Sequence, residues 1–164
     1  MIIRYATFKD SAKIAEIYNF YVVNTAATFE ETPVSSEEIS SRITKVQDAN
    51  LPWIVALKDD AIVGYAYATK WKERSAYRFS VESTIYLSSQ AQGKGLGTQL
   101  YKALLVKLKS HGINNVIGGI TLPNPASVAL HEKLQMRKVA HFPQVGFKFG
   151  KWLDVGYWQL NLRD

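Results

Sequence analysis

Three glycines at alternate positions, Gly93, Gly95 and Gly97, lie between an apolar, β-branched segment and an amphipathic one. A turn from a strand into a helix leaves backbone N–H groups without partners at the positive end of the helix dipole, and such groups bind phosphate. Glycine also lets the backbone approach an anion closely, because it has no Cβ. The pattern predicts a pyrophosphate site, although a flexible turn before a helix would have the same composition.

The spacing of these glycines excludes two widespread phosphate motifs. The third glycine comes one residue too early for the dinucleotide fingerprint G-x-G-x-x-G. The turn is not a P-loop either, because Lys94 is followed by Gly95 and not by serine or threonine. The glycines alone therefore leave the ligand open.

Glu82, in the strand that precedes the glycines, is the residue best suited to accept a proton. Alternation along the strand places the side chains of Glu82, Thr84 and Tyr86 on one face, so that the carboxylate has two polar neighbours. Partial burial would raise the pKa of this carboxyl toward the working pH of a general base. The alternative is a strand glutamate held in a structural ion pair.

The chain has three histidines and no cysteine. His131 could donate or accept a proton near neutral pH, or it could be a packed core residue. His111 and His141 have no companions at the spacing of metal ligands, so we expect them to be structural or surface residues and expect no metal site. The lack of cysteine excludes a thiol nucleophile within this sequence and agrees with a cytoplasmic location.

The elements that must position these residues follow from apolar periodicity and from turn residues. The segment 35–38 is typical of a helix start, Asp59-Asp60 of a hairpin turn, and His111-Gly112 of a helix end. The predicted helices span about 10–23, 36–46, 95–110 and 125–134, and the predicted strands about 1–5, 53–58, 61–71, 79–88, 115–122, 140–148 and 154–162. The order β-α-α-β-β-β-α-β-α-β-β predicts an α/β fold, with a mixed central β-sheet flanked by helices.

Length and composition predict a single domain over residues 1–164. The net charge of +6 suggests a nucleic-acid partner, but the basic residues are scattered without a dense run, so we expect none. Apolar runs such as residues 53–57 are too short to span a bilayer, and the first strand begins at once. We therefore expect neither a membrane span nor a targeting segment.

Residues 90–95, Gln-Ala-Gln-Gly-Lys-Gly, also fit the pattern Arg/Gln-x-x-Gly-x-Gly/Ala. Further blocks with a recognisable sequence are 17–19 with 24–30, 76–77 with 81–86, 122–132, and 145–152 with 154–160. The first pattern resembles the acetyl-coenzyme A (acetyl-CoA) signature of the GNAT acetyltransferases, and the element order is that of GNAT domains. Taken together, the blocks are most similar to the phosphinothricin and methionine sulfoximine/sulfone N-acetyltransferases of that superfamily.

This resemblance implies a GNAT fold with acetyl-CoA as co-substrate. It assigns the pantetheine arm to the backbone of Ile85, Tyr86 and Leu87, where one N–H would also face the thioester oxygen. His131 lies where many members of the superfamily carry a tyrosine that protonates the thiolate. The remaining cofactor residues that it implies are Gly93, Lys94, Gly95, Leu96, Gly97 and Thr98 for the pyrophosphate, and Asn124, which is otherwise an ordinary turn residue before Pro125.

The resemblance also implies an acceptor pocket, made of Phe29, Lys72, Glu73, Arg74, Tyr77, Glu82, Ser83 and Thr84. Arg74 could hold a carboxylate or phosphinate with two N–H groups while Lys72 adds a point charge, unless both belong to a solvated loop. Phe29 could equally be a core aromatic.

The expected reaction is direct transfer of an acetyl group to the α-amine of a small amino-acid analogue, with Glu82 as general base. Phosphinothricin, methionine sulfoximine and methionine sulfone are the expected acceptors. The alternatives are another amine, such as a polyamine or a protein N-terminus, or an acyl-CoA sensor without turnover.

Two further features concern the C-terminal third. Its aromatic residues either complete the core or, as the resemblance implies, lie at a homodimer interface; they are Phe147, Phe149, Trp152, Tyr157 and Trp158. Leu134-Gln135-Met136 stands where many GNAT chains have Leu-Gly-Phe. Because glutamine disfavours positive φ, we expect the helix end to differ there.

Overall fold

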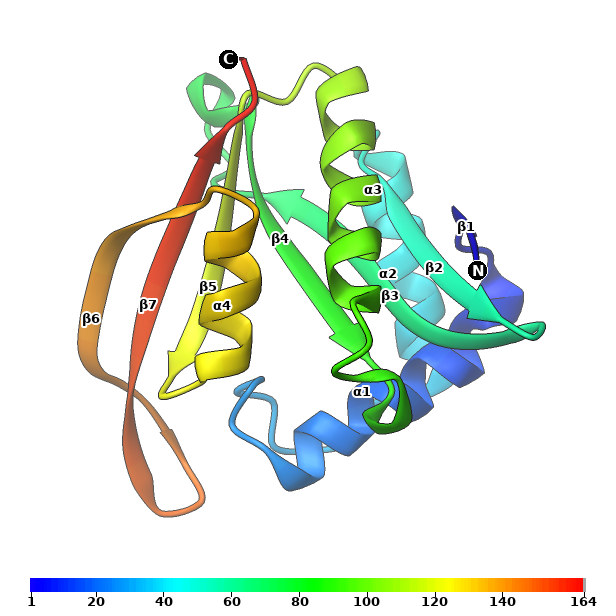
Figure 1. Cartoon of the computed structure of the whole chain (residues 1–164), viewed down its shortest axis with the longest axis horizontal. Helices are drawn as coiled ribbons and strands as arrows, with labels where there is room; N and C mark the ends of the chain where they lie inside the picture. The colour runs from blue at the N-terminus through cyan, green and yellow to red at the C-terminus, as the bar shows by residue number, and fades with distance from the viewer. Residues whose placement is uncertain (164) are drawn as a thin grey trace.

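The computed structural model describes residues 1–163, which form a seven-stranded sheet in the order β1-β2-β3-β4-β5-β7-β6 (Figure 1). The strands are β1 (Ile2–Tyr5), β2 (Trp53–Lys58), β3 (Ala61–Lys70), β4 (Ser80–Leu87), β5 (Asn115–Leu122), β6 (Arg137–Lys148) and β7 (Lys151–Asn161). The α-helices are α1 (Ser11–Asn24), α2 (Ser36–Asp48), α3 (Leu96–Ser110) and α4 (Pro125–Lys133). Short 3-10 turns, η1 (Phe8–Asp10), η2 (Ser75–Tyr77) and η3 (Ser89–Ala91), add to the predicted order, which is confirmed.

The sheet divides between its two central strands. Neighbouring strands run antiparallel except β4 and β5, which are parallel. Their pairing covers only three residue pairs, from Ser80 with Asn115 to Glu82 with Ile117. Beyond Glu82 the two strands diverge, as Figure 1 shows. The sheet therefore opens into a V at the end of β4 that leads into the glycine turn.

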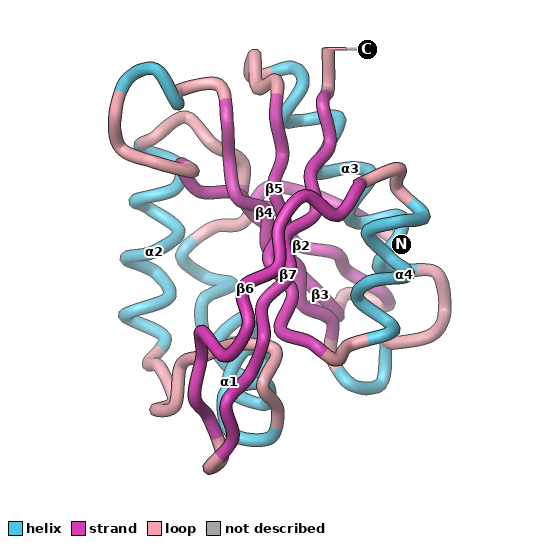
Figure 2. The backbone as a smooth tube through the Cα atoms, turned by 90° about the vertical axis from the view of Figure 1, so that its left-hand side faces the viewer, coloured by secondary structure: helices cyan, strands magenta, loops and turns pink. Residues whose placement is uncertain are grey.

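Helices cover both faces of the sheet (Figure 2). On one face lie α1 and α2, and on the other lie α3 and α4. One face of α3 is apolar and buried, since Leu100, Leu104 and Leu108 are each 0 % exposed. Because these leucines recur every four residues, one face of α3 fixes the helix against the sheet, and its N-terminus then points at the opening of the V.

Local signals in the sequence account for several element ends. Ser35 caps α2 by accepting a hydrogen bond from the N–H of Glu38, and both Asp59 and Asp60 have positive φ in the β2–β3 turn. Gln135 has a φ of 66° after α4, so the chain keeps the left-handed conformation there without a glycine. This conformation costs a non-glycine residue conformational energy, yet Gln135 adopts it after α4, so the expectation that the lack of glycine would alter the helix end is wrong.

The last two strands form a long hairpin whose aromatic residues divide into three groups. Trp158 is buried in the core, Tyr157 is half-buried, and Phe147, Phe149 and Trp152 are 53 %, 57 % and 64 % exposed. The core explanation thus holds for Trp158 and not for the hairpin tip. Both strands begin earlier than predicted, at Arg137 and Lys151. No helix within residues 1–163 combines the length and apolar character that a membrane span requires.

Candidate active site

A cleft of about 1060 Å³ occupies the opening of the V. Its walls come from the diverging strands β4 and β5, from the glycine turn, from the start of α4, from the α1–α2 loop and from the β6–β7 hairpin. Segments from both ends of the chain therefore meet around one space, which has room for a ligand the size of a nucleotide coenzyme.

The glycine turn forms the end of the cleft nearest α3. Gly93 and Gly95 have φ of 74° and 75°, and no atom lies within 4 Å of the position that a Cβ would take at either residue. Gly95 is the N-cap of α3 and offers no side-chain cap, and the first intrahelical bond is donated by Gln99. The N–H groups of Leu96, Gly97 and Thr98 are therefore available, which fits an anionic diphosphate.

The structure separates the residues predicted for this phosphate site. Gly93, Gly95, Gly97 and Thr98 line the cleft, whereas the side chains of Lys94 and Leu96 do not. Lys94 is exposed, and Leu96 packs against the core. If Lys94 and Leu96 bind phosphate, they would then do so through their backbone N–H groups.

The end of β4 offers its backbone to the same cleft. Ile85, Tyr86 and Leu87 line it, and the ladder to β5 has already ended at Glu82. The Leu87 carbonyl accepts a hydrogen bond from the Tyr21 hydroxyl, which in turn accepts one from Gln92 Nε2 at 2.7 Å. Sequence reasoning missed this contact, because Tyr21 lies 66 residues away from Leu87 along the chain.

Asn124 has a structural role, which agrees with its interpretation as a turn residue before Pro125. Its Oδ1 accepts a hydrogen bond from the N–H of Ser127 at 3.2 Å and so caps α4. The residue also lines the cleft. Capping uses the carbonyl oxygen of the side chain, so that the amide NH₂ group stays available as a donor.

Glu82 lies deep in the cleft, with its carboxylate reaching toward β5. Oε1 is 3.4 Å from the position that a Cβ would take at Gly119, so a glycine there leaves room for it. Among residues 1–163 the carboxylate forms no hydrogen bond or ion pair, which contradicts the structural alternative. Burial raises the pKa of Glu82 above its usual value, and the charge of Lys72 partly opposes this. A half-buried, unpaired carboxylate with a raised pKa is suited to general-base chemistry.

His131 lines the cleft from the face of the sheet opposite to that of Glu82. Its ring is buried, and Nδ1 lies 2.7 Å from the Ser127 carbonyl oxygen, so Nδ1 carries the proton and donates it. Nε2 lies 2.6 Å from the position of a Cβ at Gly118, a residue that must therefore lack a side chain. Burial lowers the pKa of His131. The resting imidazole is neutral, with a lone pair on Nε2.

Ser83 and Thr84 point to opposite faces of β4. The Ser83 hydroxyl hydrogen-bonds that of Tyr101 on α3, whose ring packs edge-on against His131 with 5.3 Å between ring centres. Thr84 lies opposite Tyr67 in the β3–β4 ladder, on the same face as Glu82. Both line the cleft, so alternation correctly predicted that only Thr84 shares a face with Glu82.

The predicted acceptor residues are only partly brought together. Phe29 lines the cleft and packs on Gly146, where an added Cβ would lie 2.2 Å from its ring. The segment 72–77, which includes Lys72, Glu73, Arg74 and Tyr77, forms an exposed connection between β3 and β4 and does not line the cleft. Lys72 is still near enough to Glu82 for its charge to oppose the rise of the carboxyl pKa.

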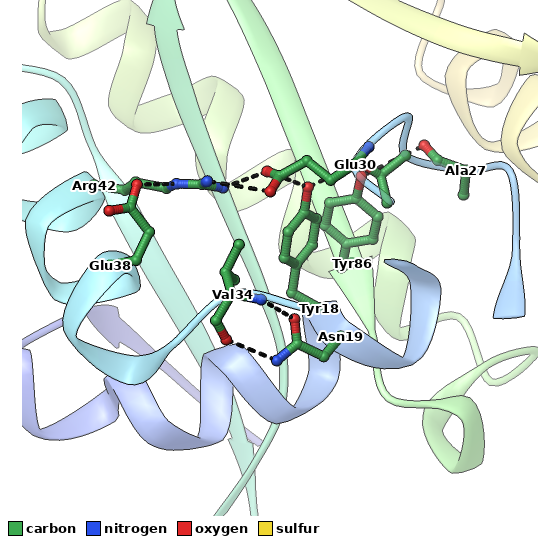
Figure 3. A network of polar contacts seen from close by, with 9 residues as sticks. Tyr18, Asn19, Ala27, Glu30, Val34, Glu38, Arg42 and Tyr86 are labelled. Atoms are coloured by element: carbon green, nitrogen blue, oxygen red, sulfur yellow. Dashed lines mark hydrogen bonds and ion pairs between the residues drawn. The ribbon is translucent and has the colours of Figure 1, made fainter. Parts of the chain in front are cut away.

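A polar network holds the α1–α2 loop over the cleft (Figure 3). Glu30 accepts hydrogen bonds from the Tyr18 hydroxyl at 2.7 Å and from the guanidinium of Arg42, which also pairs with Glu38. The Tyr18 hydroxyl lies 2.8 Å from that of Thr28. These bonds fix Thr28 and Phe29 as one wall of the cleft, and the sequence contained no local signal for them.

Comparisons with known proteins agree with this geometry. A family model described as an acetyltransferase (GNAT) domain matches residues 3–156. The phosphinothricin N-acetyltransferase of Streptomyces viridochromogenes is 40 % identical over 96 % of this chain and 85 % of its own. The L-methionine sulfoximine/L-methionine sulfone acetyltransferase of Salmonella typhimurium is 36 % identical over 99 % and 95 %.

A solved structure is equally similar. YncA, an acetyltransferase from Salmonella typhimurium determined with its cofactor acetyl-CoA, superposes with a TM-score of 0.96 at 35 % identity and covers 99 % of this chain and 94 % of its own. The expected fold and family are both confirmed. The chain belongs to the GNAT family of acetyltransferases.

Proposed function

We propose that this protein transfers the acetyl group of acetyl-CoA to the α-amine of a small amino acid or amino-acid analogue of the phosphinothricin or methionine sulfone type. The observation that carries the proposal is the unpaired carboxylate of Glu82, half-buried in the same cleft as the uncapped glycine turn. A base and a diphosphate site in one cleft are what direct transfer from a coenzyme thioester to an amine requires.

The parts of the cleft have separate tasks in this proposal. The N–H groups at Gly93 to Thr98 would hold the diphosphate, and the backbone of Ile85 to Leu87 would hold the pantetheine arm. When bound, the coenzyme supplies an activated acetyl thioester. Glu82 accepts the proton of the attacking amine, either directly or through a water molecule.

His131 acts in this scheme as a proton acceptor. Its Nδ1 proton is committed to the Ser127 carbonyl, and burial keeps the ring neutral, so Nε2 can accept the second proton that the substrate ammonium loses on becoming an amide and can return it to the departing thiolate. A role as the initial acid would require an imidazolium, which burial disfavours. We therefore assign it a proton relay on the face of the sheet opposite Glu82.

The choice of acceptor rests on the relatives and on charge. The relatives named above are acetyltransferases of phosphinothricin and of methionine sulfoximine and sulfone. Lys72 and Arg74 lie in the exposed segment beside the cleft, where they would attract an anionic acceptor and repel a polyamine. Glu73 and Tyr77 remain predicted contacts of the same segment.

The test is release of coenzyme A thiol with a panel of acceptors: phosphinothricin, methionine sulfone, glutamate, spermidine and a short peptide. Saturable turnover confined to the amino-acid analogues is the expected result. Turnover with spermidine or peptide alone would retain the fold and overturn the acceptor. Tight binding of acetyl-CoA without turnover on any acceptor would favour a sensor.

A homodimer, in which the single domain of residues 1–164 pairs through its C-terminal hairpin, belongs to the same proposal, as does a cytoplasmic location. The exposed rings of Phe147, Phe149 and Trp152 on the hairpin support it, because monomers seldom expose so many adjacent aromatic side chains. Sedimentation of the wild type and of Trp152→Glu tests the interface. A wild-type monomer, or a Trp152→Glu dimer, would contradict it.

A further inference from the structure

One lysine of the hairpin differs from an ordinary surface lysine. Lys148, at the end of β6, is only 2 % exposed, although lysines are almost never buried without a partner. Its Nζ donates a hydrogen bond of 2.8 Å to the carbonyl oxygen of Thr28, in the α1–α2 loop. Lys148, Thr28 and Phe149 all line the cleft. An ammonium group is therefore held at the wall of the site that the proposed function uses.

The hydrogen-bonding capacity of this ammonium is only partly used. Of its three N–H donors, one goes to Thr28, and the face of the Phe149 ring lies 5.1 Å from Nζ. Among residues 1–163 no carboxylate lies within 4 Å of Nζ. Two donors thus have no hydrogen-bond acceptor among these residues.

The nearest acidic residues do not neutralise it. Glu30 is engaged by Tyr18 and by both terminal nitrogens of Arg42, and Glu31 is exposed. Both act on Lys148 only at longer range, where they oppose the lowering of its pKa by burial. A buried cation without a contact counterion is costly, and an anionic ligand group would remove that cost.

We propose that Lys148 binds the α-carboxylate of the acceptor amino acid, with its Nζ held in place by the Thr28 carbonyl. The inference rests on the proposed function, which it deepens: Glu82 faces the α-amine, and Lys148 selects acceptors that carry a carboxylate beside that amine. Lys148 projects from the β5 half of the V, whereas Glu82 projects from the β4 half. An α-amino acid would then be held from both sides of the cleft.

The experiment compares an acid with its amide. Steady-state kinetics are measured for wild type, Lys148→Met and Lys148→Arg with methionine sulfone and with methionine sulfone α-carboxamide. In Lys148→Met we expect KM for methionine sulfone to rise about 10- to 100-fold, the loss typical of a hydrogen bond to a charged group. KM for the amide should change less than about 3-fold, and Lys148→Arg should recover part of the difference. Lys138→Met, which removes an exposed lysine of the same strand outside the cleft, is the matched control.

Each other outcome overturns a different claim. An equal loss with acid and amide, together with a lower melting temperature, would make Lys148 a structural link between hairpin and loop. A rise in KM for acetyl-CoA alone would make it a coenzyme contact. If Lys148→Met behaves as wild type while wild type acetylates methionine sulfone, the inference fails and the proposed function stands. If wild type acetylates neither compound nor any other amino acid, the proposed function fails and the inference fails with it.

Discussion

The hydroxyl of Tyr21, on α1, donates a hydrogen bond to the main-chain carbonyl of Leu87, at the end of β4. Gln92, in the turn that follows β4, donates to the same hydroxyl. Tyr21, on the face of the sheet that we propose binds the acceptor, is thereby bonded to the end of β4 and to the turn after it, both of which belong to the proposed coenzyme site. The two halves of the proposed reaction share one positioning residue.

We expect Tyr21→Phe to weaken the coenzyme site and to leave the chemistry largely intact. It removes one donor and one acceptor worth about 1 kcal/mol, so KM for acetyl-CoA should rise about 3- to 10-fold while kcat changes little. Tyr5→Phe, on the exposed strand β1, is the control. An unchanged KM together with a reduced kcat would instead assign Tyr21 to the chemical step.

Replacing Glu82, the proposed base, should stop turnover without affecting coenzyme binding. For Glu82→Gln we expect kcat to fall about 100- to 10,000-fold, the range for a general base, with an unchanged Kd for acetyl-CoA by calorimetry. Glu16→Gln, in an exposed ion pair of α1, is the control. In wild type, kcat should fall as the pH drops through the raised pKa of Glu82, so the acidic limb lies above the usual carboxyl value of 4.5. A variant with normal turnover would remove Glu82 from the mechanism.

The same substitution should stabilise the fold at neutral pH. A carboxyl whose pKa is higher in the folded than in the unfolded chain opposes folding when it is ionised. This cost is absent below the unfolded pKa and fully present above the folded pKa. Chemical denaturation should therefore find Glu82→Gln more stable than wild type at pH 8 and equally stable at pH 4. A variant less stable at both values would show that the carboxylate has a structural partner.

Folding stability should also depend on the protonation of His131, in the opposite direction from its dependence on Glu82. Its pKa is lowered by burial, so the folded state binds this proton less readily than the unfolded chain. The folded protein keeps its full stability above the pKa that His131 has in the unfolded chain, near 6.5. It loses stability as the pH falls below that value. Relative to wild type, His131→Gln should therefore lose less stability between pH 7.5 and pH 5 in urea unfolding. Parallel pH profiles for the two proteins would contradict a neutral, buried His131.

Glycines at the two ends of α3 allow the effect of backbone strain on stability to be separated from an effect on coenzyme binding. Gly95 before the helix and Gly112 after it have φ of 75° and 79°, and neither has an atom within 4 Å of a would-be Cβ. Alanine at either position should cost about 1 kcal/mol of stability through the left-handed conformation alone. Only Gly95→Ala should also raise the Kd for acetyl-CoA, because Gly112 lies outside the cleft. Equal binding by both variants would argue against the glycine turn as the diphosphate site.

The sequence predicted what depends on neighbours along the chain. The strand that carries Glu82, the turn at Gly93 and Gly95, and the helix that follows this turn are all local patterns, and each was found as predicted. Lys148 reads locally as a solvent-facing strand residue, because the loop that buries it lies 120 residues earlier. Contacts that join distant segments leave no local signal, so the burial of Lys148 could not be predicted.

The segment from Lys72 to Tyr77 is a case in which the prediction had no local pattern behind it. It was predicted as an acceptor wall on resemblance, and not on any pattern of its own. Within one chain the segment is exposed and stands outside the cleft, so its assignment remains a prediction.

The parting of β4 and β5 has a mechanical consequence. The ladder between the two half-sheets has only three residue pairs, at the apex of the V, while at its mouth the contact of Phe29 with Gly146 and the Lys148–Thr28 bond join the hairpin to the α1–α2 loop. The two walls of the cleft are thus linked both at the apex and at the mouth, so neither wall is free at the mouth. We expect its width to be set jointly by the apex and by the hairpin, so that a change in the hairpin would alter the spacing of groups on β4 that the hairpin does not contact.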